Sequence, residues 1–266
     1  MDRLAQLEHQ SVYILREAFA RLERLAMLWS IGKDSTVLLW LARKAFGGHV
    51  PFPLVHIDTS FKIPEMIAYR DRMVAEWQLD LRVVRNESAL AAGMNHERGR
   101  VTCCHALKTQ PLEGLLRDGG YRGLIVGVRK DEQQTRAKER TISLRGADLS
   151  WAAHDQAPEL WGQFNTDLTP GTHARVHPLL DWTEINVWEY IERESIPVLG
   201  LYFARNGHRY RSLGCAPCTA PVASRAETVE QVIAELRDSR ASERDGRAQD
   251  LETEDAFERL RRDGYL

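Results

Sequence analysis

The sequence predicts an α/β protein with a doubly wound, mostly parallel sheet and a helical or irregular C-terminal extension. Short apolar runs alternate with amphipathic helical segments along the chain, which favours parallel strands joined by crossover helices. Residues 53–58 form an apolar run that ends in polar residues, a pattern typical of a buried parallel strand. A length of 266 residues with 43% hydrophobic content is enough for one large domain and an extension.

Each element follows from its local pattern. In residues 4–22 the apolar side chains recur close to one helical face, which predicts an N-terminal helix. Pro64 fits an early helical position and Thr183 fits an N-terminal cap. The charged residues after 238 predict a loosely structured tail. The expected strands are 25–29, 53–58, 81–84, 123–128 and 175–180, and the further expected helices are 35–46, 64–77, 109–118, 183–193 and 227–238.

Charge and hydropathy exclude several classes of protein. The formal net charge of −2 gives no general attraction to nucleic acid or to an anionic membrane. No apolar run approaches the ~20 residues of a membrane span, and residues 1–10 are too polar for a signal peptide. These features predict a cytoplasmic protein.

The turn at residues 30–35, Ser-Ile-Gly-Lys-Asp-Ser, predicts an anion site. It joins an apolar run to an amphipathic helix, so main-chain N–H groups at the start of the helix point to one place. Ser30 and Ser35 add hydroxyl donors, Lys33 adds a cation, and Gly32 lets a ligand approach the main chain closely. This number of donors suits a polyphosphate ligand. The Walker-type phosphate-loop pattern, G-x-x-x-x-G-K-[ST], is absent from this turn. An ordinary turn with an Asp or Ser cap is the alternative.

Further candidate residues are expected at the same edge, because ligands bind beyond the carboxyl ends of parallel strands. Asp58 follows the second strand and could hold a ribose hydroxyl or a magnesium ion, or cap the next turn. His56 lies within that strand, where a core histidine is the ordinary explanation, and it is retained as a neighbour of the nucleotide. A cation-rich stretch after the fourth strand contains Arg129, Arg136 and Arg140. It is either a solvated loop or an oxyanion contact made by planar guanidinium groups.

The four cysteines fall in two motifs. Cys103 and Cys104 are adjacent, whereas Cys215 and Cys218 form a Cys-x-x-Cys pair. In a cytosolic chain such patterns favour metal ligation or redox chemistry over structural disulfides. On spacing alone, zinc, a [4Fe–4S] cluster and buried free thiols all remain open.

Residues 30–35 resemble the PP-loop of the ATP pyrophosphatase superfamily, with Ile31 in place of the first glycine of Ser-Gly-Gly-Lys-Asp-Ser. These enzymes cleave ATP between the α and β phosphates. The resemblance therefore implies an adenine nucleotide α-hydrolase-like fold that uses ATP and Mg²⁺. Residues 129–140, and nearly all of the chain, are similar to the small subunit of bacterial sulfate adenylyltransferase. The implied organisation is an N-terminal helix (1–24), a PP-loop ATP pyrophosphatase domain (25–200) and a C-terminal extension with the Cys-x-x-Cys pair (201–266).

The cysteines resemble the cluster motif of assimilatory adenylylsulfate reductases, a group in the phosphoadenylylsulfate (PAPS) reductase family. Lys108 matches a lysine that this group keeps beside its cluster and substrate. This resemblance implies a [4Fe–4S] cluster held by Cys103, Cys104, Cys215 and Cys218. Together the resemblances imply cofactor binding by Ser30, Gly32, Lys33, Asp34, Ser35, His56 and Asp58, and catalysis by Lys33, Asp34, Lys108, Arg129, Arg136 and Arg140.

Several functions fit these motifs. The cysteine set and the short segment 204–212 both depart from sulfate adenylyltransferase small subunits. They favour the ATP-activating, cluster-bearing component of DNA phosphorothioation, which replaces a phosphate oxygen by sulfur. Sulfate adenylyltransferase is the alternative. A reductase is disfavoured because no cysteine follows Cys218 to act as a nucleophile, and the intact loop disfavours a mere assembly module.

Each role implies partners. Sulfur insertion implies a cysteine desulfurase and other DNA-modification proteins. These partners would supply most contacts to DNA, since no basic stripe with interleaved aromatic residues is present. Sulfate adenylylation implies a GTPase large subunit, and either role is compatible with a homo-oligomer.

Overall fold

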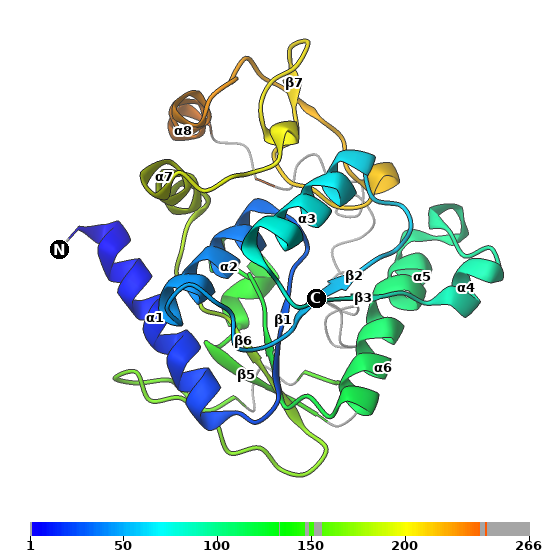
Figure 1. The fold of residues 1–266 in the computed structure, drawn as a ribbon, viewed down its shortest axis with the longest axis vertical. Helices are drawn as coiled ribbons and strands as arrows, with labels where there is room; N and C mark the ends of the chain where they lie inside the picture. Colours follow the sequence, from blue (N-terminus) through cyan, green and yellow to red (C-terminus); the bar gives the residue numbers. More distant parts are fainter. Residues whose placement is uncertain (1, 133, 147–148, 152–155, 240–242, 244–266) are drawn as a thin grey trace.

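A six-stranded sheet lies at the centre of the molecule (Figure 1). The structure, a computed structural model, describes residues 2–132, 134–146, 149–151, 156–239 and 243. The strand order is β3-β2-β1-β4-β6-β5, and neighbours pair in parallel except that β5 runs antiparallel to β6. This arrangement confirms the predicted mostly parallel α/β sheet. The strands are β1 (Leu25–Leu28), β2 (Leu54–Ile57), β3 (Leu81–Val84), β4 (Gly123–Ile125), β5 (Ile142–Arg145) and β6 (His173–Val176).

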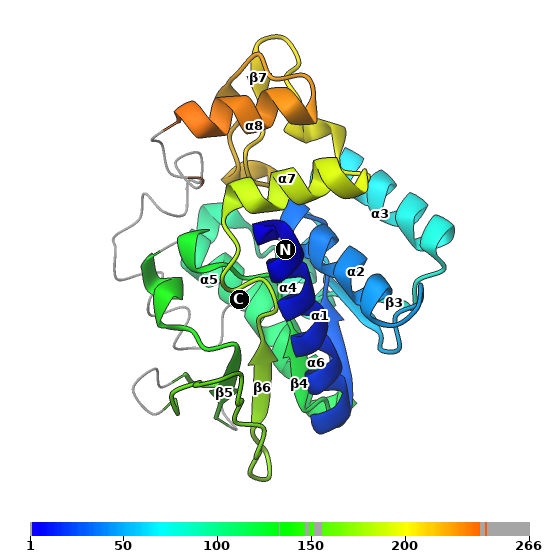
Figure 2. The same cartoon turned by 90° about the vertical axis from the view of Figure 1, so that its left-hand side faces the viewer.

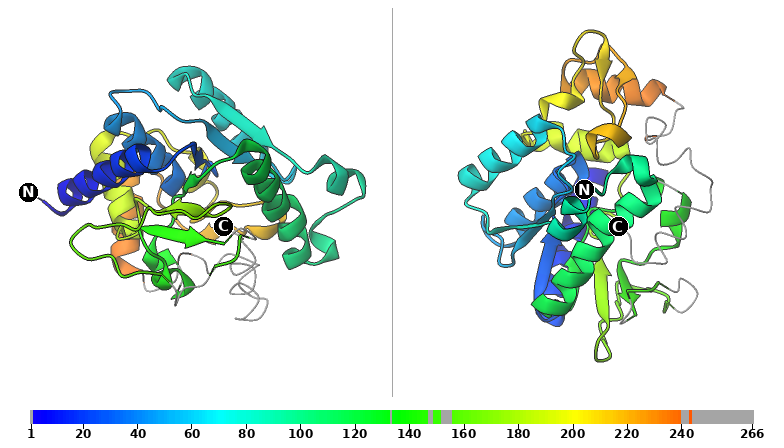
Figure 3. Two further views of the ribbon diagram at one scale, coloured as in Figure 1. Left: turned by 90° about the horizontal axis from the view of Figure 1, so that it is seen from below. Right: turned by 90° about the vertical axis from the view of Figure 1, so that its right-hand side faces the viewer.

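Helices cover both faces of the sheet, as Figures 1 and 3 show. Alternation along β1 explains the two cores: Leu25 and Met27 pack into one, while Ala26 and Leu28 pack with Leu112 into the other. The first core is shared with α1 (Arg3–Arg21), α2 (Lys33–Ala45), α3 (Pro64–Trp77) and α7 (Glu184–Glu194). The second is covered by α6 (Gln110–Gly119), which α4 (Glu87–Ala91) and α5 (Arg100–Cys104) precede in the chain.

The predicted elements differ from the structure mainly at their ends. The predicted fifth strand at 175–180 is wrong beyond Val176, because the chain turns there and the Leu180 N–H donates to the carbonyl of His177. The predicted fourth strand ends at Ile125 instead of Val128, where another tight turn begins. The antiparallel edge strand β5 was not predicted.

The C-terminal extension lies beyond the carboxyl ends of the strands. It contains β7 (His208–Arg209), β8 (Val222–Ala223) and α8 (Val229–Asp238), and α8 packs on α7 (Figure 2). Main-chain pairing fastens it to the loop after β2, since the Ala216 N–H donates to the Phe61 carbonyl over 2.7 Å. The Cys-x-x-Cys segment is thereby held at the edge of the sheet where the 30–35 turn emerges. The predicted loose tail falls on residues that, except for Ser239 and Glu243, lie outside the described ones.

Among the described residues, every helix is too short or too polar to traverse a lipid bilayer.

Candidate functional site

The 30–35 turn lies at the carboxyl end of β1, in the middle of the sheet. Ile31 adopts a left-handed main-chain conformation (φ 71°), and Gly32 caps the N-terminus of α2. The hydroxyls of Ser30 and Ser35 lie 3.0 Å apart, and Ser35 also donates to the Gly32 carbonyl. A Cβ on Gly127 would lie 3.2 Å from main-chain atoms of Ser35, so glycine lets the chain after β4 approach the first turn of α2.

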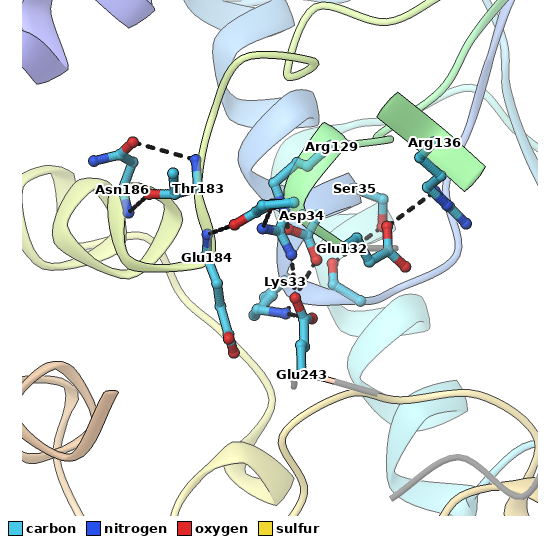
Figure 4. A network of polar contacts seen from close by, with 12 residues as sticks. Lys33, Asp34, Ser35, Arg129, Glu132, Arg136, Thr183, Glu184, Asn186 and Glu243 are labelled. Atoms are coloured by element: carbon cyan, nitrogen blue, oxygen red, sulfur yellow. Dashed lines mark hydrogen bonds and ion pairs between the residues drawn. The ribbon is translucent and has the colours of Figure 1, made fainter. Parts of the chain in front are cut away.

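Two buried cations lie beside this turn, and Figure 4 shows how carboxylates surround them. The side chains of Lys33 and Arg129 are 1% and 0% exposed. Asp34 contacts both, with its Oδ2 3.2 Å from the Lys33 Nζ. Glu243 also contacts both, with one carboxylate oxygen on Lys33 and the other on Arg129. Arg129 further donates to Asp131.

The charges at this site shift each other's protonation equilibria. Burial alone lowers the pKa of Lys33, but the Asp34 and Glu243 carboxylates outweigh burial and raise that pKa above its usual range. Burial alone raises the pKa of Glu243, but the two cations outweigh it and hold that pKa well below its usual range. Lys33 and Glu243 are therefore both charged at neutral pH.

Tyr202 binds the start of α2 from the C-terminal extension. Its hydroxyl accepts the main-chain N–H of Lys33 at 2.8 Å, one of the first N–H groups of the helix, which have no partner within the helix. The ring is 1% exposed and packs edge-on against Trp188 of α7. One donor of the predicted anion site is thus already bound to a side chain.

A cavity of about 190 Å³ opens in front of the turn. One wall is apolar and is formed by residues at or just beyond the ends of β1, β2 and β4: Leu28, Val55, Ile57, Val126 and Val128. The lining also includes the 30–35 turn, the cations Lys62, Lys108 and Arg136, the carboxylates Asp34, Glu132 and Glu243, and the segment 212–214. An apolar wall together with cations suits a ligand with a flat apolar group and an anionic group.

The structure brings together part of the predicted site. The predicted residues that line the cavity are Ser30, Gly32, Lys33, Asp34, Ser35, Lys108 and Arg136. Arg129 does not line the cavity itself, but it contacts Asp34 and Glu243, which do. Arg136 pairs with Glu132 at 2.9 Å.

Three predicted residues take other positions. His56 is buried with its Nδ1 3.0 Å from the Trp29 carbonyl oxygen, and burial lowers its pKa to about 4. Asp58 accepts the N–H of Ser60 at 2.8 Å and pairs with Arg85 across the turn. The Arg140 carbonyl contacts the His177 ring nitrogen Nδ1 at 2.8 Å.

Sequence reasoning missed Lys62 and Tyr202, and it gave the segment 242–250, which contains Glu243, only as a tail that could close over the site, dock a partner or stay solvated. Lys62 is four residues from Asp58, but nothing in its local pattern marks it as a cavity residue. Tyr202 and Glu243 are separated from Lys33 by 169 and 210 positions. Only the docking of the C-terminal residues on the sheet brings them to the turn.

The four cysteines line one small second cavity, together with Thr59, His96, Arg100 and Lys108. Cys103 is half-buried and the other three are buried. Burial and the nearby Cys104, Cys215 and Cys218 raise the pKa of Cys103 to about 11. In the described part of the chain, no three Cys, His, Asp or Glu side chains are arranged so that they could hold a metal ion. The structure thus gathers the four thiols around one cavity, and the cluster stays a prediction.

A π-helical turn, His105–Thr109, borders both cavities. It lies between α5 and α6 and carries Lys108, which lines both cavities. Such turns are rare and frequently occur at functional sites.

Comparison with known proteins gives concordant matches. Residues 24–221 match the family described as the phosphoadenosine phosphosulfate reductase domain. Sulfate adenylyltransferase subunit 2 of Myxococcus xanthus is 43% identical over 100% of this chain and 97% of its own length. The protein of that name from Rhizobium meliloti is 41% identical over 99% of this chain and 93% of its own.

Solved structures agree on the fold. A phosphoadenylyl-sulfate reductase from Candida auris superposes with a TM-score of 0.56 at 17% identity, covering 84% of this chain and 98% of that one. A Candida glabrata FMN adenylyltransferase in complex with ATP gives 0.60 at 15% identity, covering 99% and 88%.

The predicted role in DNA phosphorothioation is wrong. Relatives at 40–43% identity over essentially the full chain are named sulfate adenylyltransferase subunit 2. That prediction relied on two departures from sulfate adenylyltransferase small subunits, the cysteine set and the short segment 204–212. These departures are local, because the similarity extends over the whole chain. One alignment spans 296 positions against the 266 residues of this chain, so that relative has about 30 residues that this chain lacks.

Proposed function

Because the chain belongs to the phosphoadenosine phosphosulfate reductase domain family and is an adenylyl-transferring enzyme of it, we propose that it is the ATP-cleaving subunit of a sulfate adenylyltransferase. It would convert ATP and sulfate into adenylylsulfate and pyrophosphate. The full-length identity of 43% to a protein of that name is the observation that carries this proposal. The cavity supports it, since its lining combines apolar residues suited to adenine with the 30–35 turn and further cations suited to phosphates.

The reaction is a displacement at phosphorus. A sulfate oxygen attacks the α-phosphorus of ATP and forms a new P–O bond. The bond from the α-phosphorus to the oxygen bridging to the β-phosphorus breaks, and pyrophosphate leaves with that electron pair. Catalysis then depends on positioning the two anions and on stabilising the charge of the leaving group.

The residues of the turn are assigned to the leaving pyrophosphate. Lys33 supplies a cation, and the hydroxyls of Ser30 and Ser35 and the main-chain N–H groups of α2 that follow Lys33 supply hydrogen-bond donors. Arg129 adds charge from behind the cavity wall. Lys108 and Arg136, further along the same cavity, are assigned to the incoming sulfate.

Mg²⁺ would neutralise the phosphate charge during this reaction. The cavity offers it the Asp34 and Glu132 carboxylates. In proteins Mg²⁺ commonly takes one or two carboxylates and completes its shell with phosphate oxygens and water, so a set of three protein ligands is not required.

We also propose that the four cysteines hold a [4Fe–4S] cluster. Their convergence on one cavity supports this, because four thiols are the usual donor set for such a cluster. The cluster would fasten α5 to the Cys-x-x-Cys segment, and no step of adenylyl transfer passes through it. Anaerobically purified protein should contain about four irons per chain and absorb in the visible region, and Cys215→Ser should lose both. Zinc content with a colourless protein would contradict the cluster.

The name of the relatives, subunit 2, supports a partner. We propose a GTPase large subunit, whose GTP hydrolysis would drive the unfavourable formation of adenylylsulfate.

The experiment measures sulfate-dependent pyrophosphate release from ATP by the chain together with this partner and GTP. Lys33→Ala should lose at least about 100-fold in rate, as expected when one donor to a developing charge is removed. Lys44→Ala is the matched control, because Lys44 lies on the same helix but pairs with Glu8 and Glu194 away from the cavity. Release that does not depend on sulfate, or full activity of Lys33→Ala, would contradict the proposal.

A further inference from the structure

Glu243 lies between the two buried cations beside the 30–35 turn. It is the described residue nearest the C-terminus, and its side chain is 7% exposed and lines the cavity. One carboxylate oxygen contacts the Lys33 Nζ and the other contacts the Arg129 Nη2. Figure 4 shows the carboxylate between these two cations. The carboxylate thus occupies the position between the two cations.

Each of the two cations has a carboxylate partner besides Glu243. Lys33 and Arg129 are almost fully removed from water, and an unpaired buried charge is strongly destabilising. Asp34 contacts both cations from the side of α2, and Asp131 contacts Arg129. Glu243 completes the shell from the cavity side, which is the side from which a ligand enters.

A phosphoryl group offers the same contacts as this carboxylate. Each presents two anionic oxygens on one central atom, a geometry that suits charge-assisted hydrogen bonds to lysine and arginine. The two groups cannot share the position, because their negative charges would repel at contact distance in a buried site. Either the phosphate or Glu243 can occupy it.

We propose that the Glu243 carboxylate stands in for an ATP phosphate group between Lys33 and Arg129, so that ATP binds in exchange for Glu243. This rests on the proposed function and adds to it an autoinhibitory contact within the nucleotide site. The measured affinity for ATP is then the intrinsic affinity reduced by the fraction of molecules in which Glu243 has left the cations. A variant without the Glu243 carboxylate should therefore bind ATP with the higher, intrinsic affinity.

The test compares nucleotide binding by the wild-type chain, Glu243→Gln and Glu243→Ala. The probes are AMPCPP, an ATP analogue with a methylene group between the α and β phosphates, and inorganic pyrophosphate, each with Mg²⁺ in a calorimeter. Both variants should bind both probes at least about tenfold more tightly, equivalent to about 1.4 kcal/mol. Glu230→Gln, an exposed position on α8, is the matched control and should bind as the wild type does.

The outcomes separate this inference from the proposed function. Equal or weaker binding by Glu243→Gln, while the wild type binds AMPCPP and Lys33→Ala does not, overturns the inference and leaves the proposed function standing. No AMPCPP binding by any of these proteins contradicts the proposed function itself. Urea unfolding of each variant confirms that it is folded, and the nearly isosteric glutamine keeps the test available if alanine impairs folding.

Discussion

Tyr202→Phe tests whether the start of α2 depends on a side chain from the C-terminal extension. The substitution removes only the hydroxyl that accepts the Lys33 N–H at 2.8 Å, and it keeps the ring packed on Trp188. The N–H is buried and belongs to the first turn of the helix, so it has no replacement partner within the helix. Leaving such a donor unsatisfied costs about 1–3 kcal/mol.

The lower half of that range is expected, because removing the hydroxyl also removes the cost of burying its oxygen. The free energy of unfolding should fall by about 1–2 kcal/mol, which lowers the melting temperature by about 2–8 °C in a domain of this size. Urea unfolding followed by tryptophan fluorescence measures the change. Tyr13→Phe is the control, because Tyr13 is 47% exposed and should change stability by less than about 0.5 kcal/mol. A similarly small effect of Tyr202→Phe would refute the reasoning.

Three further predictions concern stability. Ile31→Ala and Ile31→Gly both remove a buried side chain, at a cost of about 2–5 kcal/mol, but only glycine relieves the left-handed conformation. The glycine variant should therefore be the more stable of the two, and the reverse order in urea would disprove strain at Ile31. His56 and His177 have folded pKa values lowered to about 4 by burial, so between pH 6.5 and 4 the unfolded state binds more protons. The free energy of unfolding should therefore decrease as the pH is lowered through that window, by about 1.4 kcal/mol per pH unit for each histidine. An unchanged urea midpoint from pH 6.5 to 4.5 would contradict this. Thr183 caps α7 through the Asn186 N–H, so Thr183→Ala should cost about 1 kcal/mol and Thr183→Ser only a few tenths, whereas equal losses would argue against the cap.

Local patterns predicted the elements that carry the site. Helix α3 begins at Pro64, as its sequence indicates, and Thr183 caps α7 in a full capping box. Both signals act within one helical turn, so neighbouring residues are sufficient to produce them. The edge strand β5 escaped prediction because part of its main-chain hydrogen bonding lies outside the sheet. Its Leu144 N–H donates to the Gln156 side chain.

The sequence by itself determined the parallel sheet, the strand–turn–helix unit around Lys33 and the presence of four thiols in two motifs. Only the tertiary structure decided which partners these groups meet. It buried Arg129 behind the cavity, placed Tyr202 and Glu243 at the start of α2, and gathered the cysteines around one cavity. Such contacts join residues more than 90 positions apart. They depend on how whole elements pack, because periodicity and capping act only between neighbours in the chain.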